Sequence, residues 1–197
     1  MTPPARLATL DTQRLQLRAS EPDLAPAVSA FFQRNREAHA PWNPPAPEGL
    51  FSVEGQLERL ARSAAAADAG AQIDWWLVAT DEPANVLGKI TLSQIARGSF
   101  QNAMLGYAID KAHEGRGLMR EALQAALADA FGPRVHLHRI QANVRPENTR
   151  SLALLDRLGF EREGLAREYL YIDGAWRDHV MTALRHPDWV ADPSLPT

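Results

Sequence analysis

Two glycines open a helical pattern in the middle of the chain, in the run Gly115-Arg116-Gly117-Leu118-Met119. Glycine lets backbone N–H groups approach an anion closely, and a helix N-terminus adds partial positive charge. Arg116 and Arg120 lie within the same turn and can add charge-assisted contacts. The run predicts a pyrophosphate cradle, with a plain glycine-containing strand-to-helix turn as the other interpretation. The spacing fits neither GxGxxG, since position 120 is arginine, nor the P-loop pattern, so both of those nucleotide sites are disfavoured.

A second group of polar residues follows along the chain: Asn143, Asn148 and Ser151. Asn148 is a good helix N-cap, and Ser151 then falls at the third helical position, where a serine needs no function. The functional interpretation depends on position, because this helix start follows a strand expected to lie beside the first site. Ligands in such sheets bind at the carboxyl ends of parallel strands, between helix N-termini. On the residues alone, both interpretations stay open.

Other reactive side chains give weaker signals. Glu168 lies in a strand near the C-terminus, where a lone glutamate usually belongs to a solvated face. His136 and His138 can share a strand face, but no cysteine or carboxylate pattern completes a metal site, and His113 and His179 are isolated. The chain has no cysteine and no GxSxG pattern, which argues against a cysteine nucleophile and a serine hydrolase. We therefore expect a site without metal.

The apolar periodicity indicates the elements that must position these residues. We expect strands at 15–17, 73–80, 86–93, 101–109, 138–144, 168–172 and 177–184, and helices that include 27–32, 53–69, 119–130 and 152–158. This order describes an α+β protein with seven strands and about four helices, forming a single domain over 1–197. The strand–helix–strand passage from 101 to 144 predicts a parallel pair of strands. The segment 191–197, with Pro193 and Pro196, is expected to be a disordered tail.

Composition limits the class of protein. The chain has 197 residues, of which 45% are hydrophobic and 23% charged, as in an ordinary globular domain. The net charge of −3 argues against a nucleic-acid binder that works through general electrostatics. Residues 1–10 lack an apolar signal core, and no stretch approaches about 18 consecutive apolar residues, so neither export nor membrane spanning is indicated. Absence of cysteine suits a reducing compartment, and we expect a cytoplasmic protein.

Taken together and in order, these segments resemble the GNAT superfamily of N-acetyltransferases, and within it the ribosomal-protein N-acetyltransferases of the RimJ type. The resemblance runs nearly without a break from Ala96 to Trp189 and is sparser in the N-terminal half. The matching segments include Arg97-Gly98-Ser99-Phe100, Leu105-Gly106-Tyr107, Gly115-Arg116-Gly117-Leu118-Met119, His138-Arg139-Ile140, Leu158-Gly159-Phe160-Glu161, Ile172-Asp173-Gly174, Trp176-Arg177-Asp178-His179-Val180 and Pro187-Asp188-Trp189, with Arg14-Leu15, Asn35-Arg36 and Pro41-Trp42 nearer the N-terminus.

The resemblance implies a GNAT fold, with one mixed, mostly antiparallel sheet splayed open between its fourth strand, ending at Ile109, and its fifth, at 138–144. It implies that the pantetheine arm of acetyl-CoA lies in this split and the pyrophosphate on the 115–120 turn. The cofactor-binding residues implied are Tyr107, Ala108, Ile109, Gly115, Arg116, Gly117, Leu118, Met119, Arg120, Asn143 and Asn148. Trp42 and Tyr107 are candidates for lining the acceptor groove, with simple core packing as the other interpretation.

The same resemblance implies direct attack of the amine on the thioester in a ternary complex. Glu168 matches the general base, and Ser151 matches the residue that protonates or stabilises the leaving thiolate. An α-amine has a pKa of about 7.7–8.0, so a carboxylate need only remove a weakly held proton. The backbone N–H near Ala108 or Ile109 is a candidate for stabilising the oxyanion. Whether Glu168 is the base or only binds the ammonium group stays open.

The acceptor that the resemblance implies is the N-terminal alanine or serine of a ribosomal protein. It further suggests transient ribosome association, no direct contact with nucleic acid or membrane, and a monomer or homodimer. Two other functions stay open: acetylation of a small-molecule amine, and CoA binding by a non-catalytic regulator. Glu114 stands where the superfamily usually has glutamine or arginine, and we expect its carboxylate to point away from the pyrophosphate.

Overall fold

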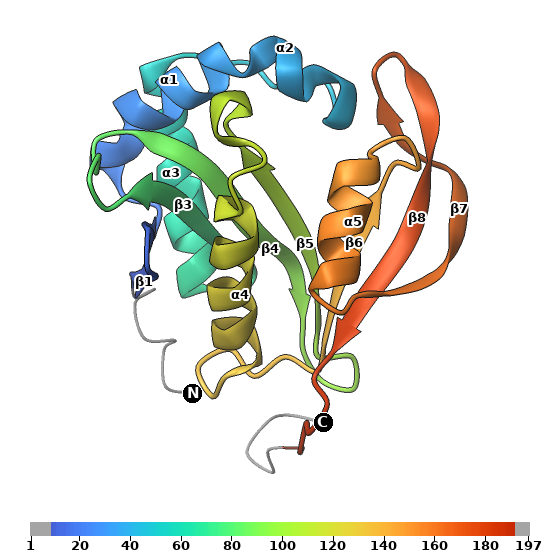
Figure 1. Cartoon of the computed structure of the whole chain (residues 1–197). Helices are drawn as coiled ribbons and strands as arrows, with labels where there is room; N and C mark the ends of the chain where they lie inside the picture. Colours follow the sequence, from blue (N-terminus) through green and yellow to red (C-terminus); the bar gives the residue numbers. More distant parts are fainter. Residues whose placement is uncertain (1–8, 192–197) are drawn as a thin grey trace.

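The computed structural model describes residues 9–191, and in this range one sheet of eight strands extends across the molecule (Figure 1). Its order is β1-β2-β3-β4-β5-β6-β8-β7, and neighbouring strands are antiparallel except for β5 and β6, which are parallel. The strands are β1 (Leu10–Asp11), β2 (Leu15–Arg18), β3 (Ile73–Ala79), β4 (Val86–Ala96), β5 (Asn102–Ile109), β6 (Arg139–Val144), β7 (Glu161–Ile172) and β8 (Ala175–Arg185). The expected mixed sheet and its parallel pair are confirmed.

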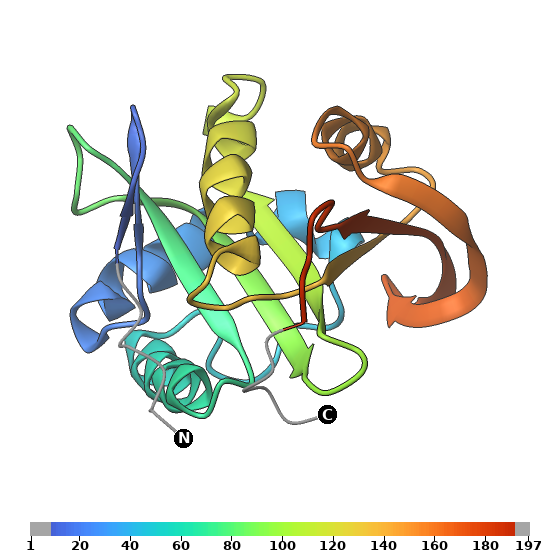
Figure 2. The same ribbon diagram turned by 90° about the horizontal axis from the view of Figure 1, so that it is seen from below.

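Helices cover both faces of this sheet. Two of them, α1 (Ala25–Arg34) and α3 (Val53–Asp68), lie on one face, whereas α4 (Leu118–Phe131) and α5 (Thr149–Arg157) lie on the other (Figures 1 and 2). The described chain also forms α2 (Arg36–His39) and three short 3-10 turns, η1 (Pro22–Leu24), η2 (Ala40–Trp42) and η3 (Lys111–His113). Within the described residues, no helix is both long enough and apolar enough to span a bilayer.

The core lies on both faces of the central strands. Trp75 and Trp76 are adjacent in β3, so their side chains point to opposite faces, and each is buried in a different apolar cluster. The cluster around Trp75 includes Met119, Leu123 and Leu127, which recur at helical spacing on α4. Burial of each such side chain stabilises the fold by about 1.5–3 kcal/mol. The apolar face that the sequence predicts for this helix therefore packs on the sheet.

Within the described residues, strand pairing between the two halves of the sheet is confined to the beginnings of β5 and β6. Their register pairs are Asn102–Arg139, Ala103–Ile140 and Met104–Gln141. Beyond these pairs the strands diverge, and β5 continues to Ile109 with β4 as its partner on one edge. The splay that the sequence predicts between these strands is therefore confirmed. It leaves backbone N–H and C=O groups on the other edge of β5 without a strand partner.

Several elements differ from the sequence-based expectation. The two residues of β1 and the four of α2 are too few to show an apolar period, so the described chain has eight strands and five α-helices instead of seven and about four. β7 begins at Glu161, not at residue 168, because the first part of this edge strand is exposed and shows no alternation. The prediction of a disordered tail falls, after residue 191, outside the described residues.

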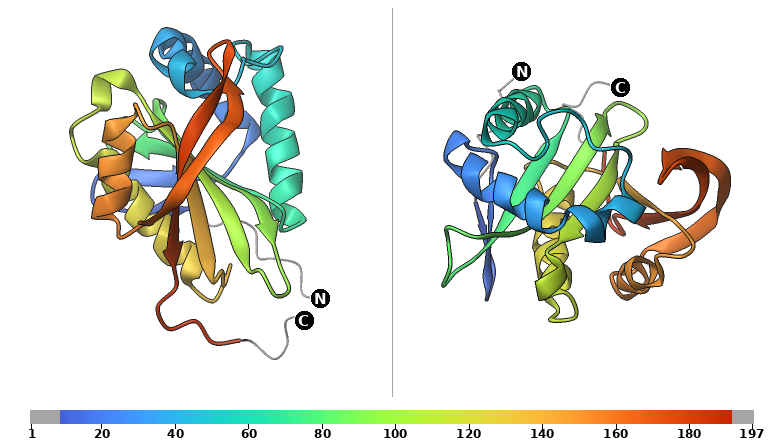
Figure 3. Two further views of the ribbon diagram at one scale, coloured as in Figure 1. Left: turned by 90° about the vertical axis from the view of Figure 1, so that its right-hand side faces the viewer. Right: turned by 90° about the horizontal axis from the view of Figure 1, so that it is seen from above.

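β7 and β8 form a long hairpin beside α5 (Figure 3). Their register shifts between Ala166 and Leu170, where three residues of β7 face the single residue Asp178 of β8. Glu168, in the middle of this bulge, has a φ of +50°, a left-handed conformation that is uncommon for glutamate. Bulges with such backbone conformations are frequent beside functional sites, where they redirect side chains.

Candidate active site

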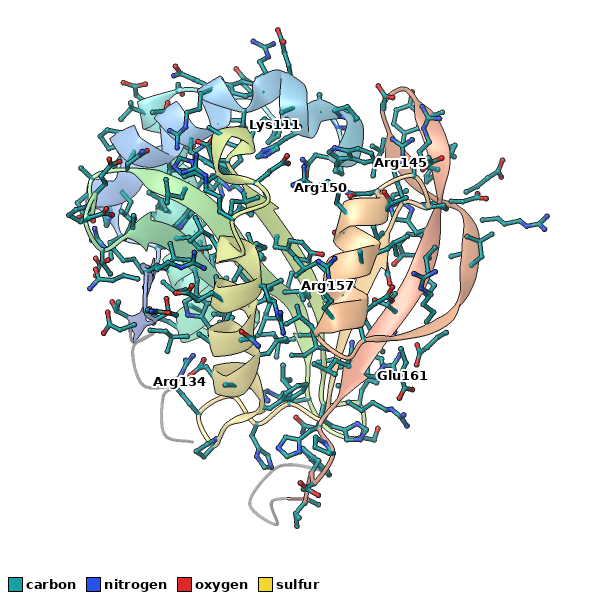
Figure 4. All side chains as sticks on the ribbon, viewed as in Figure 1. Lys111, Arg134, Arg145, Arg150, Arg157 and Glu161 are labelled. Atoms are coloured by element: carbon teal, nitrogen blue, oxygen red, sulfur yellow. The ribbon has the colours of Figure 1, made fainter. Side chains whose placement is uncertain are left out.

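A cleft opens where β5 and β6 diverge. It has a volume of about 1020 Å³ and is lined by residues of β5, β6, η2, the N-terminal ends of α4 and α5, and by His179 of β8. Its lining is rich in cations: Lys111, Arg120, Arg145, Arg150 and Arg157. Figure 4 shows Lys111 and Arg150 on the two sides of its upper end and Arg157 between α4 and α5. The cleft is therefore suited to a long ligand with anionic groups.

The N-terminus of α4 forms one wall of the cleft. Gly115 and Gly117 have φ values of +75° and +78°, a conformation that glycine adopts without the strain of other residues. Gly117 is the N-cap residue, and no side chain caps the helix there. The first N–H groups of α4 therefore have no intrahelical partner and are available to an anion. Arg116 is exposed, does not line the cleft, and accepts a hydrogen bond from Arg14 Nη1 on its carbonyl oxygen at 3.0 Å.

Glu114 lies at the mouth of the cleft, between two cations. Its Oε2 is 3.1 Å from Lys111 Nζ and forms an ion pair with Arg150, which belongs to the first turn of α5. Glu114 lines the cleft, and the expectation that its carboxylate points away from a pyrophosphate stays a prediction. The two cations compensate its charge, and the ion pair with Arg150 connects the opposite walls.

Asp110 connects η3, the turn that precedes α4, to α1. Its carboxylate forms an ion pair with Arg34, and its Oδ1 accepts a hydrogen bond from the Ala112 N–H at 2.9 Å. Asn35 Oδ1 accepts a hydrogen bond from the Lys111 N–H at 2.8 Å. Burial tends to raise the pKa of Asp110, but the hydrogen bonds and charge of Arg34 and the Ala112 N–H outweigh it, so this pKa lies below its ordinary value. The carboxylate therefore stays ionised and holds η3 in place.

A hydrogen bond connects β5 and α5 across the cleft. Tyr107 Oη lies 2.5 Å from Ser151 Oγ, and either hydroxyl can be the donor. Burial raises the pKa of Tyr107 to about 12, although the hydrogen bond with Ser151 acts in the opposite direction. The phenol is therefore protonated at neutral pH. Tyr107 and Ser151, which are 44 positions apart in the chain, thus form a pair of hydroxyl groups that can donate a proton.

Two asparagines hold the other wall. Asn148 Oδ1 accepts a hydrogen bond from the Ser151 N–H at 3.1 Å, which confirms Asn148 as the N-cap of α5. Asn143 Nδ2 donates to Tyr169 Oη at 3.0 Å. Asn143 Oδ1 is buried at the cleft and has no hydrogen-bond partner within residues 9–191. A buried acceptor of this kind is expected to be paired, so it is available to a ligand donor.

The backbone N–H and C=O groups of Ile109 lie on the free edge of β5 and point away from β4. Asp110 N–H donates to Leu87 O at 2.7 Å, so alternate residues of β5, including Ala108, direct their N–H groups toward β4. Ile109 then points its N–H and C=O the other way, and its carbonyl oxygen contacts His39 Nε2 at 2.9 Å. Of the Ala108 and Ile109 N–H groups, that of Ile109 therefore lies on the free edge of β5 and can donate to a ligand.

Trp42 lines the cleft, and its side chain is 39% exposed, so it is not a core residue. The Arg145 guanidinium lies 5.5 Å from its ring centroid, and Arg145 Nη1 donates to Pro41 O at 2.5 Å. These contacts connect η2, on one half of the sheet, to the loop after β6 on the other half.

Comparisons with known proteins agree with this geometry. The acetyltransferase (GNAT) domain family matches residues 14–161, most of the chain. The chain belongs to the GNAT acetyltransferase family. It is 41% identical to the ribosomal protein uS5-alanine N-acetyltransferase of Escherichia coli K12, over 91% of this chain and 92% of the relative. The N-acetyltransferase activity and the GNAT fold that the sequence predicts are thereby confirmed.

Solved structures of GNAT enzymes have the same architecture. The ribosomal-protein-S5-alanine acetyltransferase of Vibrio fischeri superimposes with a TM-score of 0.89 at 31% identity, covering 94% of this chain and all of that one. RimJ of Mycobacterium smegmatis, in complex with CoA-disulfide, gives a TM-score of 0.85 at 30% identity, covering 94% of this chain and 90% of that one.

The cleft brings together most of the residues that the sequence singles out. Those that line it are Trp42, Tyr107, Ala108, Ile109, Gly115, Gly117, Leu118, Met119, Arg120, Asn143, Asn148 and Ser151. Arg116 and Glu168 do not line it. Glu168 is exposed on the β7 bulge, and its backbone N–H donates to Asp178 Oδ1 at 2.9 Å.

Sequence reasoning missed several cleft residues, including Lys111, Arg145, Arg150 and His179. Arg150 carries a usable signal, because it stands two residues after the Asn148 cap and so in the first turn of α5. His179 is distant in sequence from every other lining residue and carries no such signal. In the part of the chain that the structure describes, no group of three or more histidine, cysteine, aspartate or glutamate residues is placed to hold a metal ion.

Proposed function

We propose that this GNAT enzyme transfers the acetyl group of acetyl-CoA to the α-amino group of the N-terminal alanine of ribosomal protein uS5. The observation that carries the proposal is the open cleft between β5 and β6, with the uncapped N-terminus of α4 on one wall and a proton-donating pair inside it. The 41% identity to the E. coli uS5-alanine enzyme over nearly the full length of both chains supports this acceptor.

The residues of the cleft fit acetyl-CoA. The first-turn N–H groups of α4 and the side chain of Arg120 would hold the pyrophosphate, and Arg150 and Arg157 add positive charge on the other wall. Asn143 Oδ1, a buried acceptor without a described partner, matches the amide N–H donors of a pantetheine arm. When bound, acetyl-CoA supplies an acetyl group activated as a thioester. The complex of M. smegmatis RimJ with CoA-disulfide supports the same ligand class here.

The chain's own residues then take distinct roles. The Ile109 N–H, directed away from β4, donates to the carbonyl oxygen as negative charge develops on it. Ser151, supported by Tyr107, gives a proton to the leaving sulfur. Glu168 is exposed and outside the cleft lining, so we propose the role of attracting the peptide ammonium group in preference to that of general base. Direct transfer in a ternary complex needs no cysteine, and the chain has none.

The acceptor enters from the side of η2 and the β7–β8 hairpin. Trp42 and Arg145 border this side, and an extended N-terminal peptide can lie between them and the hairpin. We propose a cytoplasmic enzyme, a monomer or homodimer, that meets its substrate on the ribosome only transiently. A single domain over the whole chain is part of this proposal.

The first prediction concerns the acceptor. A peptide with the N-terminal sequence of ribosomal protein uS5 and a free alanine amine should be acetylated with saturation kinetics. The same peptide with a blocked N-terminus and an internal lysine should not react, because only an α-amine loses its proton easily near neutral pH. A serine-initiated peptide measures how strictly alanine is required. Steady-state release of CoA is the measurement.

Three other outcomes would contradict the proposed acceptor. Faster acetylation of lysine side chains would indicate a lysine acetyltransferase. Faster acetylation of small amines would indicate a small-molecule enzyme. Tight binding of acetyl-CoA without turnover of any amine would indicate a regulator.

A further inference from the structure

One buried histidine lines the cleft and has no role in the chemistry described so far. His179, in the middle of β8, is only 3% exposed and is a lining residue. We propose that His179, not Glu168, accepts the proton of the attacking amine. This inference rests on the proposed function, because it assumes an α-amine in the cleft.

Contacts fix the tautomer of the ring. His179 Nδ1 lies 3.0 Å from the carbonyl oxygen of Arg177. A carbonyl can only accept a hydrogen bond, so Nδ1 carries the proton and Nε2 presents a lone pair. Within residues 9–191, Nε2 has no hydrogen-bond partner, and it is not among the fully enclosed polar atoms. It is therefore the atom of the ring that remains free to take a proton.

Cross-strand pairing places His179 beside Asn143. Asn143 of β6 is paired with Met181 of β8, and His179, two residues earlier on β8, lies on the same face as Met181. Tyr169 joins the group: its ring centroid is 5.3 Å from that of His179, and its hydroxyl accepts the hydrogen bond from Asn143. This group of three side chains, which we name the β6–β8 triad (Asn143, Tyr169 and His179), borders the cleft.

The strained bulge of β7 explains how Tyr169 reaches the triad. Pairing is regular from Gly164 to Ala166, which faces His179, and resumes at Leu170, which faces Arg177. The three residues between them face one residue of β8, and Glu168 takes up the positive φ that this mismatch requires. The strain at Glu168 thus positions Tyr169 against His179, while the Glu168 side chain itself stays exposed.

The proposed proton transfers balance. The peptide ammonium nitrogen starts with three protons, and the amide product keeps one. His179 Nε2 takes the first and later releases it to water. The amine lone pair then forms the C–N bond, the C–S bond breaks, and its electron pair leaves with sulfur. The nitrogen of the tetrahedral intermediate then gives its second proton to His179 Nε2, which is free again, and Ser151 gives its own proton to sulfur. His179 returns that second proton to Ser151 through water, so the net products are the amide, the CoA thiol and the one proton released to solvent.

The second prediction tests this assignment with two substitutions, using acetyl-CoA and the alanine peptide. His179→Gln should lower kcat by about 10²–10⁴ while acetyl-CoA binding is kept, since it removes the base and not the cofactor site. Glu168→Gln should raise the KM for peptide and spare kcat. His186→Gln, the same substitution just beyond the far end of β8, is the matched control and should behave as the parent. Added imidazole should restore part of the activity of His179→Ala.

The inference is overturned if His179→Gln keeps the parent kcat and Glu168→Gln loses it. A parent protein that acetylates no peptide would contradict the proposed function instead, so the two failures are distinguishable. Where the substituted proteins do not fold, ring ¹⁵N resonances of the unsubstituted protein decide. An unreactive CoA–peptide conjugate should shift the His179 resonances, and unchanged resonances at saturation would contradict the assignment.

Discussion

The hydrogen bond between Tyr107 and Ser151 joins the two halves of the sheet at the place where the leaving group is expected. Since the pKa of Tyr107 is raised to about 12 by burial, its phenol can donate a proton over the whole range in which an α-amine titrates. Ser151 is held from the other side by the Asn148 cap. The Ser151 hydroxyl is therefore held between the Tyr107 phenol and the expected position of the leaving sulfur. It can receive a proton from Tyr107 and give one to the sulfur.

The third prediction is that these two hydroxyls act as one unit. Ser151→Ala and Tyr107→Phe should each lower kcat by less than about 10², because water can share the protonation of a thiolate. The double variant should lose no more than the worse single variant, as expected when two groups serve one proton transfer. Tyr171→Phe, exposed on β7, is the matched control. Effects that multiply in the double variant would show that the two hydroxyls act independently.

The same pKa gives the direction of a pH effect. The neutral phenol is the donating form, so ionisation of Tyr107 can lower activity only as pH rises toward 12. Below that range, Tyr107→Phe and the parent should have kcat–pH profiles of the same shape.

At the scale of elements, the N-terminus of α4 carries the cofactor proposal. The fourth prediction is that Gly117→Asp lowers acetyl-CoA affinity at least about tenfold, because it puts a negative charge where an anion binds and strains a residue at φ +78°. Gly98→Asp is the control, since Gly98 has a similar φ of +67° and lies in the turn at the opposite end of β5. Isothermal titration of folded variants is the measurement. Equal affinity of Gly117→Asp and the parent would place the pyrophosphate elsewhere.

How much of this could be predicted from sequence depended on the range of the interaction. The α4 turn and the Asn148 cap were predictable, because a glycine pair and an N-cap act within a few residues of the helix that they start. The contact of Tyr107 with Ser151 was not, since it depends on how far β5 and β6 diverge after three register pairs. The β6–β8 triad was not predictable for a similar reason. Its geometry requires a bulge at Glu168, and a glutamate in the sequence does not indicate a positive φ.

At the scale of the whole molecule, the charge of the cleft differs in sign from the net charge of the chain. The chain has a net charge of −3. Among the described residues that line the cleft, however, five are lysine or arginine, and one, Glu114, is acidic. A cationic cleft in a mildly acidic protein is suited to attract the phosphates of the proposed CoA ligand. In the proposed function, both halves of the sheet contribute to the cofactor site, and both border the acceptor side, through η2 and the β7–β8 hairpin.

The fifth prediction tests the central claim, that this protein acetylates the N-terminus of ribosomal protein uS5. Intact-mass spectrometry of ribosomal proteins is compared between cells that contain the protein and cells from which it has been deleted. The account predicts that uS5 loses the mass of one acetyl group on deletion, with an unmodified N-terminal alanine in its first peptide, and regains it when the gene is restored. Fully acetylated uS5 in the deletion strain, or loss of acetylation from another ribosomal protein alone, would contradict the account.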